Sequence, residues 1–284
     1  MISFSPVRVD AASLVRYEAL FTACFSKQEK FSPTSLAWLY ADNPDGSVVG
    51  FDAYDGDVLA AHYVCIPASI RLNGKVEKTL LSLNTATHPA YQGKGMFTKL
   101  AEMTYRAGAD LGYGSVYGVA NANSTPGFIR KLGFQLVQPL HAKIGCGSLG
   151  VDKVVAARQA QFERVWSAES LAWRCANPTN SIHGRQTSQH GLALHADAFG
   201  KLVPAYAELP LLSGFQADAP AFFSPLRLFL GLVPHGAGGL ARYAEIPQRM
   251  RPSPLNLIFR SLTATPVKLE AGHIAFSFLD FDAY

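Results

Sequence analysis

The spacing of hydrophobic and polar residues in the first half of the chain predicts two helices followed by a run of strands. Apolar residues at helical spacing predict a helix from Asp10 to about Phe25, and Pro33, in a tolerated first-turn position, opens a second helix through Tyr40. Alternating patterns then predict two hairpins, the second of them turning at Asn73-Gly74, a dipeptide typical of tight turns. The expected strands are 48–54, 58–66, 68–72 and 76–87.

After these strands the pattern alternates between helix and strand. We expect a helix at 96–111, a short buried strand at 115–119, a helix at 124–132 and a strand from Phe134 onward. Antiparallel strands followed by strand–helix–strand–helix–strand predict an α/β fold in which helices cover a mixed sheet.

The second half of the chain contains a partial repeat of the first. The pattern pauses at 147–150, so we place a boundary there and expect domains at 1–147 and 148–284. The sequence SLAW occurs at 35–38 and again at 170–173, and each copy is followed by Asn-Pro and a candidate hairpin. We interpret this as a decayed duplication. The alternative is a shared way of packing a helix, with both tryptophans as core residues.

Composition and charge narrow the function classes. With 49% hydrophobic and 16% charged residues in 284, the chain has globular composition. A net charge of +4 without a dense basic tract disfavours nucleic acid as a partner, and it suits either an anionic small ligand or an ordinary surface. We find no secretion-signal pattern, no membrane-length apolar run and no CxxC pair among the four cysteines. These observations predict a cytoplasmic monomer or homodimer with reduced cysteines, without a metal site or a membrane partner.

One loop, TATHPAYQGKGMF at residues 85–97, carries the pattern that points to chemistry. A strand ends at His88 and a helix begins near Gly95, so the backbone amides of 93–97 should face one concavity at the positive end of a helix dipole. Gly93 and Gly95 leave the backbone open to a phosphate group, and Lys94 adds a flexible positive charge. The glycine spacing matches neither a P-loop nor a dinucleotide-binding fold.

This loop resembles the pyrophosphate loop of the GNAT N-acetyltransferase superfamily, whose signature is (Q/R)-x-x-G-x-(G/A). Residues 92–95, QGKG, look like the common form of that loop, although Ala90 replaces the first Gln/Arg when the glycines are aligned. A second segment, NANSTPGFIRKLGF at 121–134, resembles the family's Asn-x-x-(A/S)-x-x-x-(Y/F)-x-x-x-G-F. One helix and one strand separate the two motifs, as in the family. The resemblance covers about 1–147.

The resemblance implies a GNAT mixed sheet flanked by helices, followed by a second, degenerate GNAT-like half that shapes the acceptor site. It also implies acetyl-CoA or another short acyl-CoA as cosubstrate and no metal. A backbone amide of the strand end would polarise the thioester carbonyl. For Arg130, a solvated helix face is an equally good interpretation. The residues implied to bind the cosubstrate are Thr85, Ala86, Thr87, Gln92, Gly93, Lys94, Gly95, Met96, Phe97, Asn121, Asn123, Phe128 and Arg130.

Acyl transfer from a thioester to an amine needs a base for the ammonium and an acid for the leaving thiolate. Many family members carry a tyrosine acid at the position that Ile129 occupies here, so the usual acid is missing or relocated. As candidate bases we name His88, where the strand opens into the loop, and His141, on the closing strand that borders the acceptor side in this fold. Tyr117 is a candidate acid. The alternatives are a capping role for His88 and simple packing for Tyr117.

The sequence therefore predicts an acyl-CoA-dependent N-acyltransferase that moves a short acyl group to a small-molecule primary amine by direct attack. The SLAW segments and the C-terminal LDFDAY resemble those of acyltransferases for nucleotide-linked amino sugars. An amino acid, a polyamine or an antibiotic amine is the alternative acceptor. The departure at Ile129 favours another class, a non-catalytic acyl-CoA-binding regulatory protein.

Overall fold

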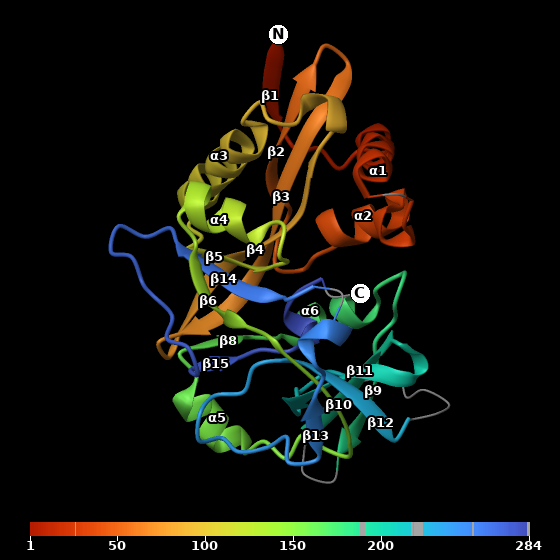
Figure 1. Ribbon diagram of the computed structural model, residues 1–284, viewed down its shortest axis with the longest axis vertical. Helices are drawn as coiled ribbons and strands as arrows, with labels where there is room; N and C mark the ends of the chain where they lie inside the picture. Colours follow the sequence, from red (N-terminus) through yellow and green to blue (C-terminus); the bar gives the residue numbers. More distant parts are fainter. Residues whose placement is uncertain (26, 188–190, 217, 219–223, 252, 283–284) are drawn as a thin grey trace.

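The computed structural model describes residues 1–25, 27–187, 191–216, 218, 224–251 and 253–282. Two sheets lie one above the other along the longest axis of the molecule (Figure 1). The upper sheet is built mainly from the first half of the chain and the lower sheet mainly from the second half. No described helix has the length and apolar character needed to cross a membrane.

The upper sheet has a mixed topology. Along its main order, neighbouring strands pair antiparallel, except that β4 (Lys75–Thr87) and β5 (Ser115–Ala120) run parallel. A short pair of strands, β8 (Phe162–Arg164) and β15 (Ile274–Ala275), extends it along β3. The main order is β1 (Ile2–Pro6), β2 (Val49–Asp55), β3 (Val58–Leu72), β4 (Lys75–Thr87), β5 (Ser115–Ala120), β14 (Asn256–Ser261) and β6 (Gln135–Pro139).

Helices cover both faces of this sheet. The pair α3 and α4 lies on one side and the pair α1 and α2 on the other (Figure 1). Two short 3-10 turns, Glu29–Phe31 and Pro89–Tyr91, connect them to the rest of the chain. The helices are α1 (Ala11–Phe25), α2 (Pro33–Tyr40), α3 (Met96–Asp110) and α4 (Thr125–Leu132).

Two details of the upper sheet differ from the sequence prediction. β1 was not expected, and the strands predicted at 58–66 and 68–72 form one continuous strand, β3, through Pro67. Proline has no backbone N–H to donate. Among the described strands none pairs with Pro67 on the edge of β3 that faces β2 and β8, because β2 pairing ends at Cys65 and β8 pairing begins at Ile70. The Pro67 carbonyl on that side instead accepts a hydrogen bond from Asn43 Nδ2 at 2.9 Å.

The lower sheet repeats the plan of the upper one with fewer helices. Its neighbours pair antiparallel, except that β11 and β12 run parallel. Two helices accompany it, α5 (Lys153–Gln159) and α6 (Ala168–Cys175). The strand order is β13 (Tyr243–Glu245), β7 (His141–Cys146), β12 (Leu226–Gly231), β11 (Gly200–Pro210), β10 (Gly191–Ala198) and β9 (His183–Thr187).

The two halves exchange strands. From the first half, β7 inserts between β12 and β13, while β14 from the second half inserts between β5 and β6. The two sheets therefore do not divide at the predicted boundary near 147. Each sheet contains a strand that lies beyond this boundary in the sequence. The expected α/β class with a mixed, helix-covered sheet is confirmed.

Both SLAW segments fold into equivalent helices, α2 and α6. Ser32 caps α2 by accepting a hydrogen bond from the Ser35 backbone N–H, and Ser167 caps α6 in the same way through Ser170. After each helix an asparagine side chain accepts a bond from the backbone two residues on, at Asn43 and at Asn177. These repeated local contacts support the predicted duplication.

Candidate functional site

The loop between β4 and α3 takes a conformation that glycine favours. Gly93 and Gly95 have φ of 78° and 76°, in the left-handed region, and Gly95 is the N-cap of α3. Apart from the adjacent residues of the chain, no heavy atom of the described residues lies within 4 Å of the position that a Cβ would take at either glycine, so the space in front of the loop is open. The loop thus presents the N-terminus of a 15-residue helix to solvent, as an anion site requires.

A cavity of about 510 Å³ opens in front of this loop. Eleven of the thirteen residues that the resemblance implied for the cosubstrate line it; Asn121 and Arg130 do not, and Lys131, which follows Arg130 on α4, does. Lys94 lies on the loop itself, with its Nζ 4.7 Å from the centre of the Tyr91 ring. Two flexible lysines therefore flank a site that suits a pyrophosphate. The predicted residues on its wall are Thr85, Ala86, Thr87, Gln92, Gly93, Lys94, Gly95, Met96, Phe97, Asn123 and Phe128.

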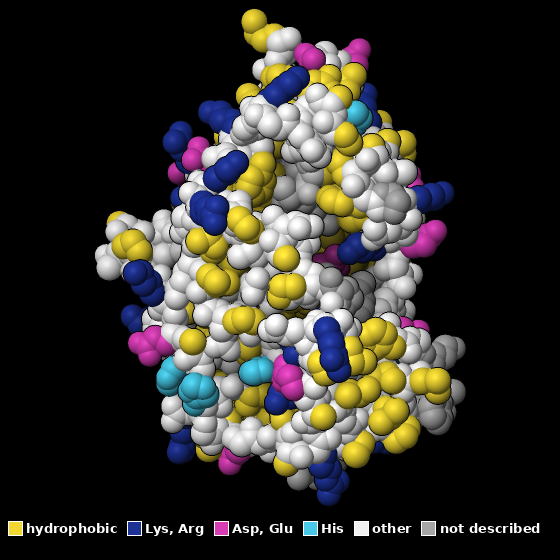
Figure 2. All heavy atoms as spheres, in the orientation of Figure 1, with side chains coloured by type: hydrophobic (Ala, Val, Ile, Leu, Met, Phe, Trp, Pro, Cys, Tyr) yellow, Lys and Arg dark blue, Asp and Glu magenta, His cyan; other side chains and the backbone are white. Residues whose placement is uncertain are grey.

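A second hollow of about 670 Å³, which we call the cleft, continues from this cavity. Thr85 and Phe128 belong to the walls of both, so the two spaces adjoin. Parallel pairing of β4 with β5 ends at Ser82 and Gly118, and the residues beyond that point line the cleft. Figure 2 shows this face of the molecule hollowed between the α3–α4 side and the α1–α2 side, with hydrophobic side chains on both walls.

The wall of the cleft also carries charge and aromatic rings. Lys30 and Asp282 line it together with Phe25, Phe31 and Phe281. The Asp282 side chain is 17% exposed and lies 4.0 Å from an Arg174 guanidinium nitrogen. Among the described residues that line the cleft, Asp282 supplies the only carboxylate.

Sequence reasoning missed Asn84 and Asp282 as site residues. Asn84 lies within the predicted strand but has φ of 47°, which no local pattern announces. Asp282 belongs to LDFDAY, a segment noticed only for its resemblance, and nothing near it in sequence indicates that the chain returns to the first sheet. Asn121, which was predicted, lines the cleft, and its Oδ1 accepts bonds from the backbone of 123 and 124.

The three candidate acid–base residues are not brought together. His88 is half-buried and accepts a bond from the Ala90 N–H, which is the capping role weighed against catalysis. His141 lies on β7 in the lower sheet, with its Nδ1 3.6 Å from a Glu245 carboxylate oxygen. The strand that carries His141 was expected beside the acceptor site, but β14 lies between β5 and β6 in the upper sheet. Neither histidine is among the described residues that line the cavity or the cleft. Their catalytic role stays a prediction without geometric support.

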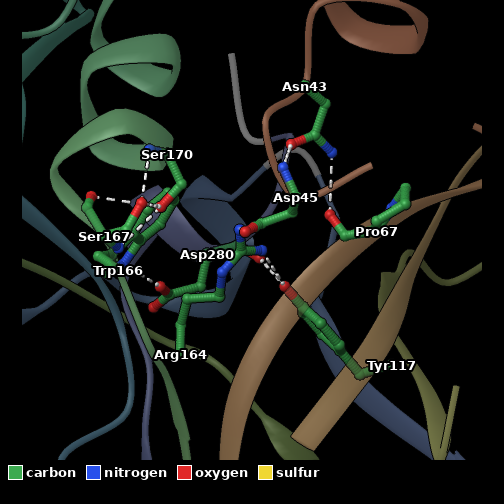
Figure 3. A network of polar contacts seen from close by, with 9 residues as sticks. All are labelled: Asn43, Asp45, Pro67, Tyr117, Arg164, Trp166, Ser167, Ser170 and Asp280. Atoms are coloured by element: carbon green, nitrogen blue, oxygen red, sulfur yellow. Dashed lines mark hydrogen bonds and ion pairs between the residues drawn. The ribbon is translucent and has the colours of Figure 1, made fainter. Parts of the chain in front are cut away.

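Tyr117 is buried in a polar network that joins the two halves (Figure 3). Its hydroxyl donates to the Asp280 carbonyl at 2.8 Å and accepts from Arg164 at 3.3 Å. Arg164 in turn pairs with Asp45 at 2.6 Å, and its guanidinium lies over the Trp166 ring. Burial raises the pKa of the Tyr117 phenol, which therefore stays protonated. These contacts indicate a structural role that holds the C-terminal segment, and with it Asp282, against the first sheet.

The described residues show no metal site, no disulfide and no second phosphate loop. Among the described residues there is no group of three His, Cys, Asp or Glu side chains placed to hold a metal ion. The four cysteines are free thiols. In the second half, the glycine-rich residues 235–239 lie between β12 and β13, and no described helix follows them there as a phosphate loop would require.

Comparison with known proteins agrees with this geometry. Residues 8–137 match the family described as acetyltransferase (GNAT) domain. A search of the curated proteins finds no match. Among solved structures, the chain is similar to a GCN5-related N-acetyltransferase from Anabaena variabilis, with a TM-score of 0.59 and 11% identity, covering 92% of this chain and 73% of that one.

Two further structures show the same likeness. A GCN5-related N-acetyltransferase from Kribbella flavida has a TM-score of 0.61 and 14% identity, covering 92% of this chain and 71% of that one. A probable N-acyltransferase from Enterococcus faecalis has a TM-score of 0.59 and 10% identity, with shares of 92% and 73%. At such identities the likeness shows the fold. The predicted GNAT mixed sheet is confirmed, and the second sheet is consistent with the predicted GNAT-like second half.

Proposed function

We propose that this chain, which carries a GNAT acetyltransferase domain, transfers a short acyl group from CoA to the primary amine of a small molecule. The observation that carries the proposal is the continuity of two spaces. The cavity in front of the Gly93–Gly95 loop suits the pyrophosphate, and it opens directly into the cleft where β4 and β5 part. A donor thioester and an acceptor amine can therefore meet at Thr85, which lies on both walls.

In this proposal the loop and the strand end bind the cosubstrate. The N-terminal amides of α3 and the charges of Lys94 and Lys131 hold the pyrophosphate, because a helix N-terminus and ammonium groups both attract anions. Backbone groups of 85–87 hold the pantetheine arm, and one amide there stabilises the negative charge that develops on the thioester oxygen.

The reaction forms a C–N bond and breaks the C–S bond of the thioester. The acceptor ammonium first loses a proton, the free amine attacks the carbonyl carbon, and the leaving thiolate of CoA takes up a proton. Asp282 is suitably placed to bind the ammonium and accept its proton, since it supplies the carboxylate of the described cleft wall. Ile129 contributes no proton, so the thiolate is protonated by another group or by water.

For the acceptor, we propose an amine on a larger polar body, with a nucleotide-linked amino sugar as the first class to test. The three phenylalanines on the cleft wall can pack against a base or a sugar ring, and Lys30 can bind a phosphate. An amino acid, a polyamine or an aminoglycoside antibiotic is the alternative. The absence of a tyrosine at Ile129 favours a non-catalytic acyl-CoA-binding protein as the competing class.

Two measurements separate these functions. Isothermal titration with acetyl-CoA tests the donor site, and a thiol-release assay with a panel of amines tests transfer. The panel contains a nucleotide-linked amino sugar, lysine, spermidine and kanamycin. Binding with release on one amine supports the enzyme, whereas binding without release on any amine supports the non-catalytic class. No heat and no thermal shift with millimolar acetyl-CoA would contradict the donor site itself.

A further inference from the structure

A chain of buried hydrogen bonds leads from β2 to the cleft. Asp52 Oδ1 lies 2.7 Å from His62 Nδ1, and His62 Nε2 lies 3.1 Å from the Tyr40 hydroxyl. Asn84 Nδ2 then donates to the Tyr40 hydroxyl at 2.9 Å. Asp52, His62 and Tyr40 are at most 1% exposed, whereas Asn84 lines the cleft. The chain thus joins a buried carboxylate to the wall of the acceptor space.

Two bonds in this chain have a fixed direction, the one that Asn84 Nδ2 donates to Tyr40 and the one that Asp52 accepts from His62. The Tyr40 oxygen accepts a hydrogen bond from Asn84, and when His62 is neutral the Tyr40 hydroxyl donates its own proton to His62 Nε2. His62 donates from Nδ1 to Asp52, because a carboxylate only accepts hydrogen bonds. Burial raises the pKa of the Tyr40 phenol, which keeps its proton available for this bond. The second oxygen of Asp52 accepts from the Tyr17 hydroxyl at 2.8 Å. A fully satisfied buried network of this kind is rigid.

The network orients the amide of Asn84. Because Nδ2 points at Tyr40, the carbonyl Oδ1 occupies the other branch of the planar amide, on the side away from the buried network. Asn84 lies on β4 two residues after pairing with β5 ends, with a φ of 47° that is uncommon for residues other than glycine. Such backbone conformations cluster where a protein positions groups for function.

We propose that Asn84 binds the acceptor amine through Oδ1, and that Tyr40, His62 and Asp52 are positioning residues that hold its amide in that orientation. This inference rests on the proposed N-acyltransferase function. A carbonyl oxygen accepts an N–H from the attacking amine without competing for its lone pair, so it can align the nitrogen with the thioester at Thr85. Alignment of this kind accounts for a large share of the acceleration in bimolecular transfers.

The chain offers a matched pair of variants to test the role of Asn84. Asn84→Gly removes the amide but keeps a residue that tolerates positive φ, and Asn73→Gly makes the same change at φ of 49° in the exposed β3–β4 turn. The assay uses acetyl-CoA and the panel amine that the wild-type chain acylates fastest. For Asn84→Gly we expect kcat/KM for the amine to fall about ten- to a hundredfold, with acetyl-CoA affinity unchanged. Asn73→Gly should match the wild type.

A double-mutant cycle tests the positioning role. Tyr40→Phe keeps the ring and removes the hydroxyl that holds Asn84. Alone it should lower kcat/KM for the amine, but in the Asn84→Gly background it should cause no further loss, because the group it positions is gone. A loss that multiplies in the double variant shows that Tyr40 acts independently of Asn84, which overturns its positioning role.

The outcomes distinguish this inference from the function on which it rests. If the wild-type chain acylates an amine and Asn84→Gly equals it, the inference is overturned and the function stands. If the loss in Asn84→Gly appears in the affinity for acetyl-CoA, Asn84 binds the donor and the inference is again overturned. If the wild-type chain binds acetyl-CoA but acylates no amine, the function and the inference fail together.

Discussion

The indole rings of Trp38 and Trp173 stack with their centres 4.9 Å apart, and each Nε1 donates a hydrogen bond to the backbone carbonyl of the other residue. The two bonds have nearly equal lengths, 3.1 and 3.0 Å. Reciprocal contacts are the mark of a two-fold interface, in which the same surface contacts itself. Each tryptophan ends a SLAW sequence, so this pair lies on the local two-fold relation between α2 and α6 and supports the duplication.

The tryptophan pair should contribute strongly and cooperatively to stability. Trp38→Phe and Trp173→Phe each remove one indole hydrogen bond and part of the stacked area, and we expect each to lower the free energy of unfolding by about 1–3 kcal/mol. In the double variant the combined loss should be smaller than the sum, because both substitutions damage one contact. Urea denaturation of the four proteins measures this. Strict additivity would show that the two rings do not support one another.

Local patterns in the sequence were sufficient to predict the donor loop and the helices around it. Gly93 and Gly95 could be identified because a left-handed backbone at a helix start favours glycine, and glycine occurs at both positions of the sequence. The boundary of α3 follows in the same way. Nine of the eleven predicted cosubstrate residues that line the cavity lie within this one segment, residues 85–97.

Contacts between distant segments could not be predicted in this way. The pattern of Asn256–Ser261 indicates a strand but does not indicate its partner. The partner strand, Ser115–Ala120, lies 136 to 146 residues earlier in the chain, and this pairing decides the architecture. The same holds for Asp282, because the segment before it is held at the cleft by two residues far away in sequence. Tyr117 donates to the Asp280 carbonyl and Arg174 to the Phe281 carbonyl. The position of His141 could not be predicted either, because β7, the strand that carries it, pairs in the second sheet and not in the first.

Charge at the loop should control binding of acetyl-CoA. At Gly95 we compare Gly95→Asp with Gly95→Asn, because both side chains have the same shape and asparagine and aspartate both tolerate positive φ. The carboxylate would repel a pyrophosphate at the helix N-terminus, so we expect affinity for acetyl-CoA to fall at least tenfold more in Gly95→Asp than in Gly95→Asn. Isothermal titration measures the difference, and circular dichroism confirms that both variants fold. Equal affinities for the two variants would refute the loop assignment.

Titration of Asp280 should make the protein less stable as pH rises through the mildly acidic range. Burial raises the pKa of this carboxyl from 3.8 to about 6, even though Trp166 Nε1 and the Ser277 backbone donate to it. The folded chain therefore binds the proton more tightly than the unfolded chain, and this contribution to stability is present below about pH 4 and is lost by about pH 6. The loss amounts to about 3 kcal/mol at most.

The Asp280→Asn variant isolates this effect. It keeps a neutral side chain of the same shape, so the difference in unfolding free energy between variant and wild type should change between pH 4 and 6.5 in favour of the variant. Chemical denaturation at several pH values measures it. A difference that is independent of pH in that range would show that Asp280 does not titrate there.

The exchange of strands predicts that neither half folds alone. Without the second half, residues 1–147 lose β14, and β5 and β6 are left with two unpaired edges in the middle of a sheet. Unpaired strand edges leave backbone groups without partners and invite aggregation. We expect this fragment to be insoluble or to lack a cooperative unfolding transition.

Co-expression with residues 148–284 should restore a soluble complex, because the two fragments together contain every strand of both sheets. Acetyl-CoA should then raise its melting temperature as it does for the intact chain. A fragment 1–147 that unfolds cooperatively and binds acetyl-CoA on its own would show that β14 is dispensable for the donor site.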